Sequence, residues 1–72
     1  MRGATSLDPQ KFDRALATRG LDGDKLAKIA ALDHSTVSRA RRGKPIRPTT
    51  IRKLVQALQE VSVIKGAEEL FP

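Results

Sequence analysis

Cysteine, tryptophan and tyrosine are absent from the 72 residues, and the chain has only two phenylalanines and one histidine. Without cysteine there is neither a disulfide nor a thiolate ligand, and one imidazole cannot form a zinc site of the usual kind. No metal or other cofactor is therefore expected.

Long apolar runs are absent as well. The uninterrupted apolar stretches are only a few residues long, whereas about 20 apolar residues are needed to cross a bilayer. The chain begins with a short polar stretch that leads into charged sequence, unlike the apolar segment of a secretory signal peptide. Since this length suffices for one small domain, we expect a single cytoplasmic domain that does not enter a membrane.

Helix-forming residues such as Ala, Leu, Lys, Arg and Gln are abundant, and β-branched residues do not alternate over more than a few positions. This composition predicts an all-α fold. We expect a compact four- to five-helix bundle with helices at about 9–19, 23–31, 34–42 and 50–59 and a possible short helix at 64–70. Residues 1–7 are expected to be a flexible arm, and residues 8–72 a single domain.

Capping residues and apolar spacing define these helices. The expected N-caps are Asp8, Asp22, Asp33 and Thr49. Gly20 and Gly43 are expected to end the first and third helices. Apolar side chains at helical spacing predict one inward face for each helix. The inward residues are expected to be Phe12, Ala15, Leu16, Leu26, Ile29, Ala30, Val37, Ala40, Ile51, Leu54, Val55 and Leu58.

The charge is unevenly distributed along the chain. Residues 34–59 hold seven basic residues and no acidic one, whereas residues 1–33 hold six basic and five acidic residues. A solvated face usually mixes both signs, because like charges repel each other. The net charge of +6 arises from the central segment, so we expect a polyanionic partner, above all nucleic acid.

The helix expected at 34–42 has the side chains that a DNA major groove accepts. Val37 and Ala40 point inward, while small hydroxyls and guanidinium groups point outward. Arg donates to guanine, and Ser or Thr can bond to several base edges. The residues expected to contact bases are His34, Ser35, Thr36, Ser38 and Arg39. Those expected to contact phosphates from the end of this helix and the following loop are Arg41, Arg42, Lys44 and Arg47.

These residues resemble the phage-repressor family of helix-turn-helix DNA-binding domains, also called Xre/Cro-type or lambda-repressor-like. The resemblance covers about residues 12–64. It is carried by Leu26-Ala27, Val37, Gly43 after the third helix and Pro48 before the fourth. The resemblance implies that helices 23–31 and 34–42 form the motif. It also implies a transcriptional regulator, in most members a repressor that binds two-fold symmetric double-stranded DNA as a homodimer.

Three positions depart from the family pattern. Ala31 stands where the turn usually has glycine, which is strained if the turn is left-handed. Gly23 stands where the family usually has a phosphate-contacting glutamine, so that contact would move to Lys25 or to a backbone N–H. Arg41 replaces the usual acidic residue, and the ion pair that this residue makes in the family is not expected here.

The C-terminal segment offers apolar residues for a dimer interface. The candidates are Val61, Val63, Ile64, Leu70 and Phe71. The same residues could instead close the core, and both roles can hold at once.

The alternative function is an antitoxin or another protein-interaction module of the same fold. An enzyme is not expected, because no paired carboxylates or nucleophile–base arrangement occurs, and no small-molecule substrate is evident.

Overall fold

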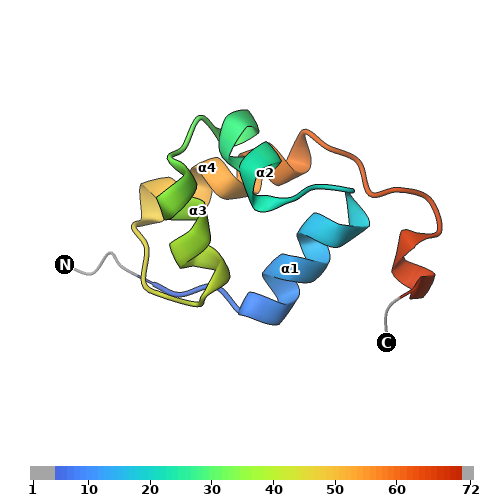
Figure 1. Ribbon diagram of the computed structural model, residues 1–72, viewed down its shortest axis with the longest axis horizontal. Coiled ribbons are helices and arrows are strands. Elements are labelled where there is room, and N and C mark those ends of the chain that lie inside the picture. Colours follow the sequence, from blue (N-terminus) through green and yellow to red (C-terminus); the bar gives the residue numbers. More distant parts are fainter. Residues whose placement is uncertain (1–4, 71–72) are drawn as a thin grey trace.

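The computed structural model describes residues 5–70. Its elements are α1 (Pro9–Thr18), α2 (Gly23–Ala30), α3 (His34–Arg41), α4 (Pro48–Gln59) and η1 (Ala67–Leu70), the last a 3-10 helix. Figure 1 shows four α-helices around one core, with η1 beyond them at the C-terminal end. The all-α prediction is confirmed, and no β-strand occurs in the described range.

Two of the predicted N-caps, Asp8 and Asp22, are confirmed. The Asp8 carboxylate accepts hydrogen bonds from the N–H groups of Gln10 and Lys11 at 2.9 and 3.2 Å. The Asp22 carboxylate accepts from the Lys25 N–H at 2.8 Å. Thr49 as an N-cap is wrong, because α4 already begins at Pro48. Proline has no N–H to leave unpaired at the first helical position.

A residue with a positive φ, in the left-handed backbone conformation, follows each of the first three helices. Gly20 and Gly43 have φ values of 69° and 75°. Ala31 also has a positive φ, 58°, and the next N–H bonds back to the Ala27 carbonyl at 2.9 Å. The turn between α2 and α3 is therefore left-handed without glycine. An L-residue in this conformation is strained by about 1–2 kcal/mol.

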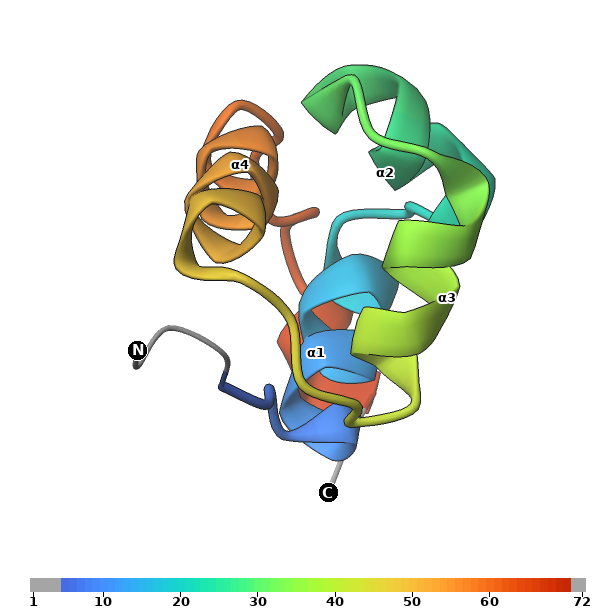
Figure 2. The ribbon, with the colours of Figure 1, turned by 90° about the vertical axis from the view of Figure 1, so that its left-hand side faces the viewer.

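The core lies where α2 meets α3 and α4, and Figure 2 shows α4 and α3 on opposite sides of it. Leu26, Val37 and Leu54 are at most 1% exposed. Two predicted inward residues are wrong: Val55 is 44% and Ile29 37% exposed. In α4 the small Ala57 is buried instead of Val55, because the side facing α2 is centred on Leu54 and Ala57.

The segments outside the α-helices are also attached to the bundle. Thr5 and Ile46 exchange backbone hydrogen bonds of 2.9 and 2.8 Å, and Leu7 packs against the core. Residues 5–7 of the expected arm therefore contact the bundle, their flexibility stays a prediction, and residues 1–4 lie outside the described range. No described helix combines the length and hydropathy of a membrane span.

At the other end, the chain after α4 is tied to the end of α1. The Arg19 guanidinium donates to the carbonyls of Leu58 and Val61 at 2.9 and 3.1 Å, and the Ile64 N–H donates to the Thr18 carbonyl at 2.8 Å. The short helix expected at 64–70 starts later, at Ala67, and is a single 3-10 turn.

Candidate nucleic-acid interface

The third helix lies at the edge of the bundle with one side anchored. Figure 2 shows α3 beside α1 and below α2, with its outer side uncovered by any other helix. Val37 and Ala40 are 1% and 0% exposed and hold the inner side against the core. Burying a valine side chain is favourable by about 1.5–3 kcal/mol, so this side fixes which residues of α3 face outward.

The residues expected to contact bases are mostly accessible. His34, Ser35 and Arg39 are exposed, and Thr36 and Ser38 are half-buried. The prediction that Ser35 and Arg39 lie opposite Val37 and Ala40 is confirmed. Ser38 differs, because its position is partly covered by neighbouring atoms.

 A shallow hollow brings α3 together with the chain that leads into α4. The hollow measures about 360 Å³ and is open to solvent on one side. It is lined by Ser35, Thr36, Arg39, Pro45, Ile46, Arg47 and Thr50. Three of the residues expected to contact bases therefore share one concave surface with Arg47, which was expected to contact phosphate.

Carboxylates contact the first two residues of α3. The Nδ1 atom of His34 lies 2.6 Å from Oδ1 of Asp24 in α2, and both side chains are 72% exposed. The Ser35 hydroxyl donates to the carboxylate of Asp33, the residue just before α3. This hydrogen bond is the main cause that lowers the pKa of Asp33. Asp33 stands at the predicted N-cap position, but its side chain makes no capping hydrogen bond to the helix.

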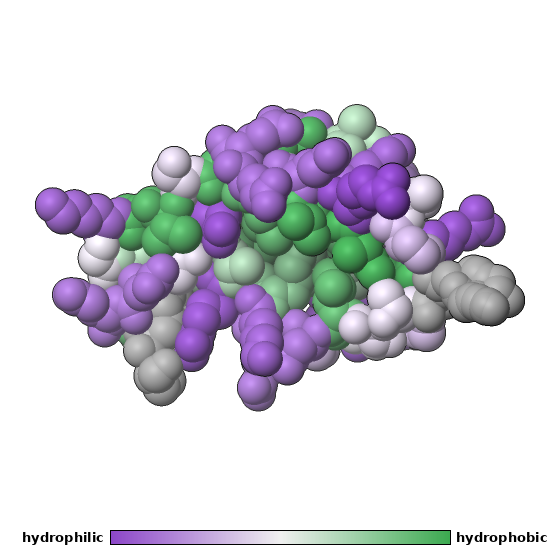
Figure 3. All heavy atoms as spheres, turned by 180° about the vertical axis from the view of Figure 1, so that it is seen from behind, coloured by the Kyte–Doolittle hydropathy of each residue, from purple (hydrophilic) through white to green (hydrophobic). Residues whose placement is uncertain are grey.

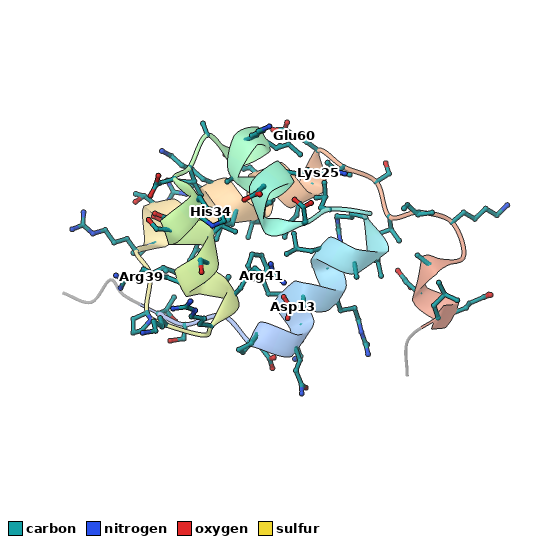
Figure 4. The ribbon with its side chains drawn as sticks, viewed as in Figure 1. Asp13, Lys25, His34, Arg39, Arg41 and Glu60 are labelled. Atoms are coloured by element: carbon teal, nitrogen blue, oxygen red, sulfur yellow. The ribbon has the colours of Figure 1, made fainter. Side chains whose placement is uncertain are left out.

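Arg41 does not point to the outer side of α3. Its Nε atom donates to Oδ1 of Asp13 in α1 at 3.1 Å, as Figure 4 shows. Its Nη1 atom also lies 3.3 Å from the place where a Cβ on Gly23 would be. This ion pair occupies Nε of a side chain that is 44% exposed, and the phosphate contact of Arg41 stays a prediction. Gly23 and Arg41, two of the departures from the family pattern, are coupled, because the missing side chain at Gly23 leaves room for the guanidinium.

The other expected phosphate contacts fall into two groups. Arg42, Lys44 and Arg47 are exposed, and none has a carboxylate partner within residues 5–70. Lys25 is exposed too, but Figure 4 places it across α2 from Arg39. A single DNA surface along α3 would thus include the first group more readily than Lys25.

Sequence reasoning missed Asp13 and Asp24 as partners of α3. They lie 28 and 10 residues before the side chains that they contact, so no helical spacing connects the pairs. The one signal in the sequence was that residues 1–33 hold five acidic residues, whereas residues 34–59 hold only basic ones. Within residues 5–70, no cluster of three or more His, Cys, Asp or Glu side chains could hold a metal ion.

The dimer candidates lie on the C-terminal segment. Val63, Ile64 and Leu70 are 37%, 53% and 82% exposed, Val61 is half-buried, and Phe71 lies outside the described residues. Figure 3 shows apolar surface among hydrophilic side chains on the face turned away in Figure 1.

No family model, no curated protein and no solved structure matches this chain. The resemblance to phage-repressor domains therefore stays a prediction from the residues themselves.

Proposed function

We propose that the protein is a sequence-specific double-stranded DNA-binding transcriptional regulator, of the repressor type, that reads the major groove with α3. The observation that carries this proposal is the two-sided character of α3. Val37 and Ala40 are buried on one side, and Ser35 and Arg39 are exposed on the other.

The dimensions and the charge of this region suit a duplex. An eight-residue helix is about 12 Å long, and a major groove about 12 Å wide admits one helix. Arg42, Lys44 and Arg47 flank the exposed side and would neutralise phosphates, while residues 34–59 contain no carboxylate to repel them. Affinity would come mainly from these cations, and sequence choice from the outer side of α3.

A homodimer on DNA belongs to the same proposal. One helix of this length reads few base pairs, whereas two helices about 34–36 Å apart read two half-sites. The exposed side chains of Val63, Ile64 and Leu70 are the candidate contacts between two copies. Sedimentation of the free chain and of its complex with DNA measures this directly, and a strict monomer in both would remove the dimer.

The test of DNA binding is a fluorescence-anisotropy titration of duplex DNA at several salt concentrations. If about four to six phosphates are neutralised per chain, log K falls with log salt at a slope of about −3.6 to −5.4, from roughly −0.9 per phosphate. Selection from a random duplex pool then shows whether one sequence is preferred. A flat salt dependence and no selected sequence would reject the proposal.

A further inference from the structure

We infer that the amino-terminal end of α3 selects a base that carries an exposed amino group, adenine or cytosine, and that protonation of His34 shifts this choice toward guanine or thymine. The inference rests on the proposed function and names what that surface reads. It is carried by the two carboxylates that contact His34 and Ser35.

The first step concerns the imidazole of His34. A neutral histidine has one N–H and one acceptor nitrogen, and the hydrogen bond at one nitrogen decides which form is present. Nδ1 lies 2.6 Å from the Asp24 carboxylate, which can only accept while it is ionised. The neutral ring therefore holds its proton on Nδ1, and Nε2 is left as an acceptor.

The second step concerns the hydroxyl of Ser35. A serine hydroxyl has one hydrogen to donate and two lone pairs that accept. The hydrogen is directed to Asp33, so the oxygen offers only lone pairs to a ligand. Asp24 and Asp33 thus take the donors of two neighbouring exposed side chains.

Nε2 of His34 and the hydroxyl oxygen of Ser35 are both acceptors, so they pair with donors on the base edges. In the major groove the adenine N6 and cytosine N4 amino groups are donors, whereas guanine O6 and N7 and thymine O4 are acceptors. A surface of acceptors pairs with an amino group and is repelled by guanine or thymine oxygen. Adenine or cytosine is therefore expected opposite His34 and Ser35.

Protonation of His34 changes this match. An imidazolium donates from both nitrogens, so Nε2 would then pair with an acceptor base while Nδ1 keeps its bond to Asp24. The carboxylates that interact with the ring are Asp24 from α2 and Asp33 from the preceding turn. On α1, the carboxylate of Asp13 is paired with Arg41. Histidine is the side chain that ordinarily changes charge between pH 5 and 8.

The tautomer can be measured first, because the chain contains a single histidine. Nitrogen-15 NMR of the whole chain at pH 8 should show a protonated Nδ1 and an unprotonated Nε2. In Asp24→Ala the proton should move to Nε2. Glu60→Gln removes one negative charge from an exposed residue after α4 and should leave the spectrum of the ring unchanged. A protonated Nε2 in the wild type would overturn the inference.

Base choice is measured by selection from a random duplex pool at pH 5.5 and at pH 8. At pH 8 the wild type should favour adenine or cytosine by roughly fivefold at one position of the half-site, as expected for one hydrogen bond. At pH 5.5 the preference should shift to guanine or thymine. His34→Gln should select the same base at both pH values.

The outcomes separate this inference from the proposed function. Selection of one and the same base by the wild type at both pH values would overturn the inference and leave DNA binding intact. Failure to bind any duplex would reject both. Asp24→Ala should also bind random DNA at least as tightly as the wild type, because it removes a charge that repels phosphates. A loss of all binding in this variant, with its fold intact by circular dichroism, would count against the assigned role.

Discussion

The two ends of α3 hold their polar side chains in opposite ways. At the amino-terminal end, His34 and Ser35 are each hydrogen-bonded to a carboxylate. At the carboxyl-terminal end, Arg39 and Arg42 are exposed and have no carboxylate partner in the described part of the chain. Imidazole and hydroxyl groups can donate or accept, whereas a guanidinium only donates. The side chains that can either donate or accept are thus the ones that a carboxylate orients.

The largest expected effect is a loss of folding stability when the core beneath both ends of α3 is disrupted. Leu26 is fully buried beneath α3 and α4. Leu26→Ala should lower the free energy of unfolding by about 2–5 kcal/mol, a large part of the stability of so small a domain. Urea denaturation measures this change. Val55→Ala, at a position 44% exposed, should cost far less, and equal losses would contradict the assigned core.

A smaller effect should separate the roles of two arginines at the carboxyl-terminal end. Arg39→Ala should weaken binding to the selected sequence by about 1–3 kcal/mol and leave random DNA nearly unaffected, because a bidentate base contact is lost. Arg42→Ala should weaken binding to all sequences alike and reduce the salt slope by about 1. Anisotropy titrations with selected and random duplexes measure both quantities.

Arg41→Ala is the control for these two variants. Its guanidinium is bonded to Asp13 and lies over Gly23, so its removal should affect the stability of the fold more than the salt slope. If all three variants lowered the salt slope equally, the distinction between Arg41 and the outward arginines would be lost.

Much of the fold could be predicted because its signals are local. Asp8 and Asp22 cap helices through bonds to residues two or three positions away, and the inward side of α3 follows from the spacing of Val37 and Ala40. The start of α4 was missed because a cap was expected at Thr49, although Pro48 can itself begin a helix.

The candidate site was predicted only in part, because its side chains are oriented by distant residues. The exposure of Ser35 and Arg39 follows from helical geometry alone. The bonds from Asp24 to His34 and from Asp13 to Arg41 depend on how three helices pack. The sequence put Arg41 among the phosphate contacts at the end of α3, but it could not show that Gly23 leaves space for its guanidinium.

A glycine in the turn between α2 and α3 should stabilise the domain. Ala31→Gly relieves the strain of a positive φ of 58° and should stabilise the domain by about 0.5–1 kcal/mol. The Tm would then rise by about 4 °C. Gly66→Ala is the matched opposite, because a Cβ there meets nothing within 4 Å and φ is +84°. It should lower the Tm, and a rise in both variants would show that φ is not the cause.

The smallest effect tests the carboxylate beside Ser35. The Ser35 hydroxyl holds the pKa of Asp33 below its ordinary value of 3.8. A carboxyl with a lowered pKa in the folded state contributes stability above the unfolded pKa, and this contribution is lost as pH falls through the folded pKa. The wild type should therefore lose stability below about pH 4, whereas Asp33→Asn should lack this component. Urea denaturation of both chains between pH 6 and pH 2.5 measures the difference, and parallel curves would mean that the Ser35 hydroxyl does not bond to Asp33 in solution and is free to donate to a base.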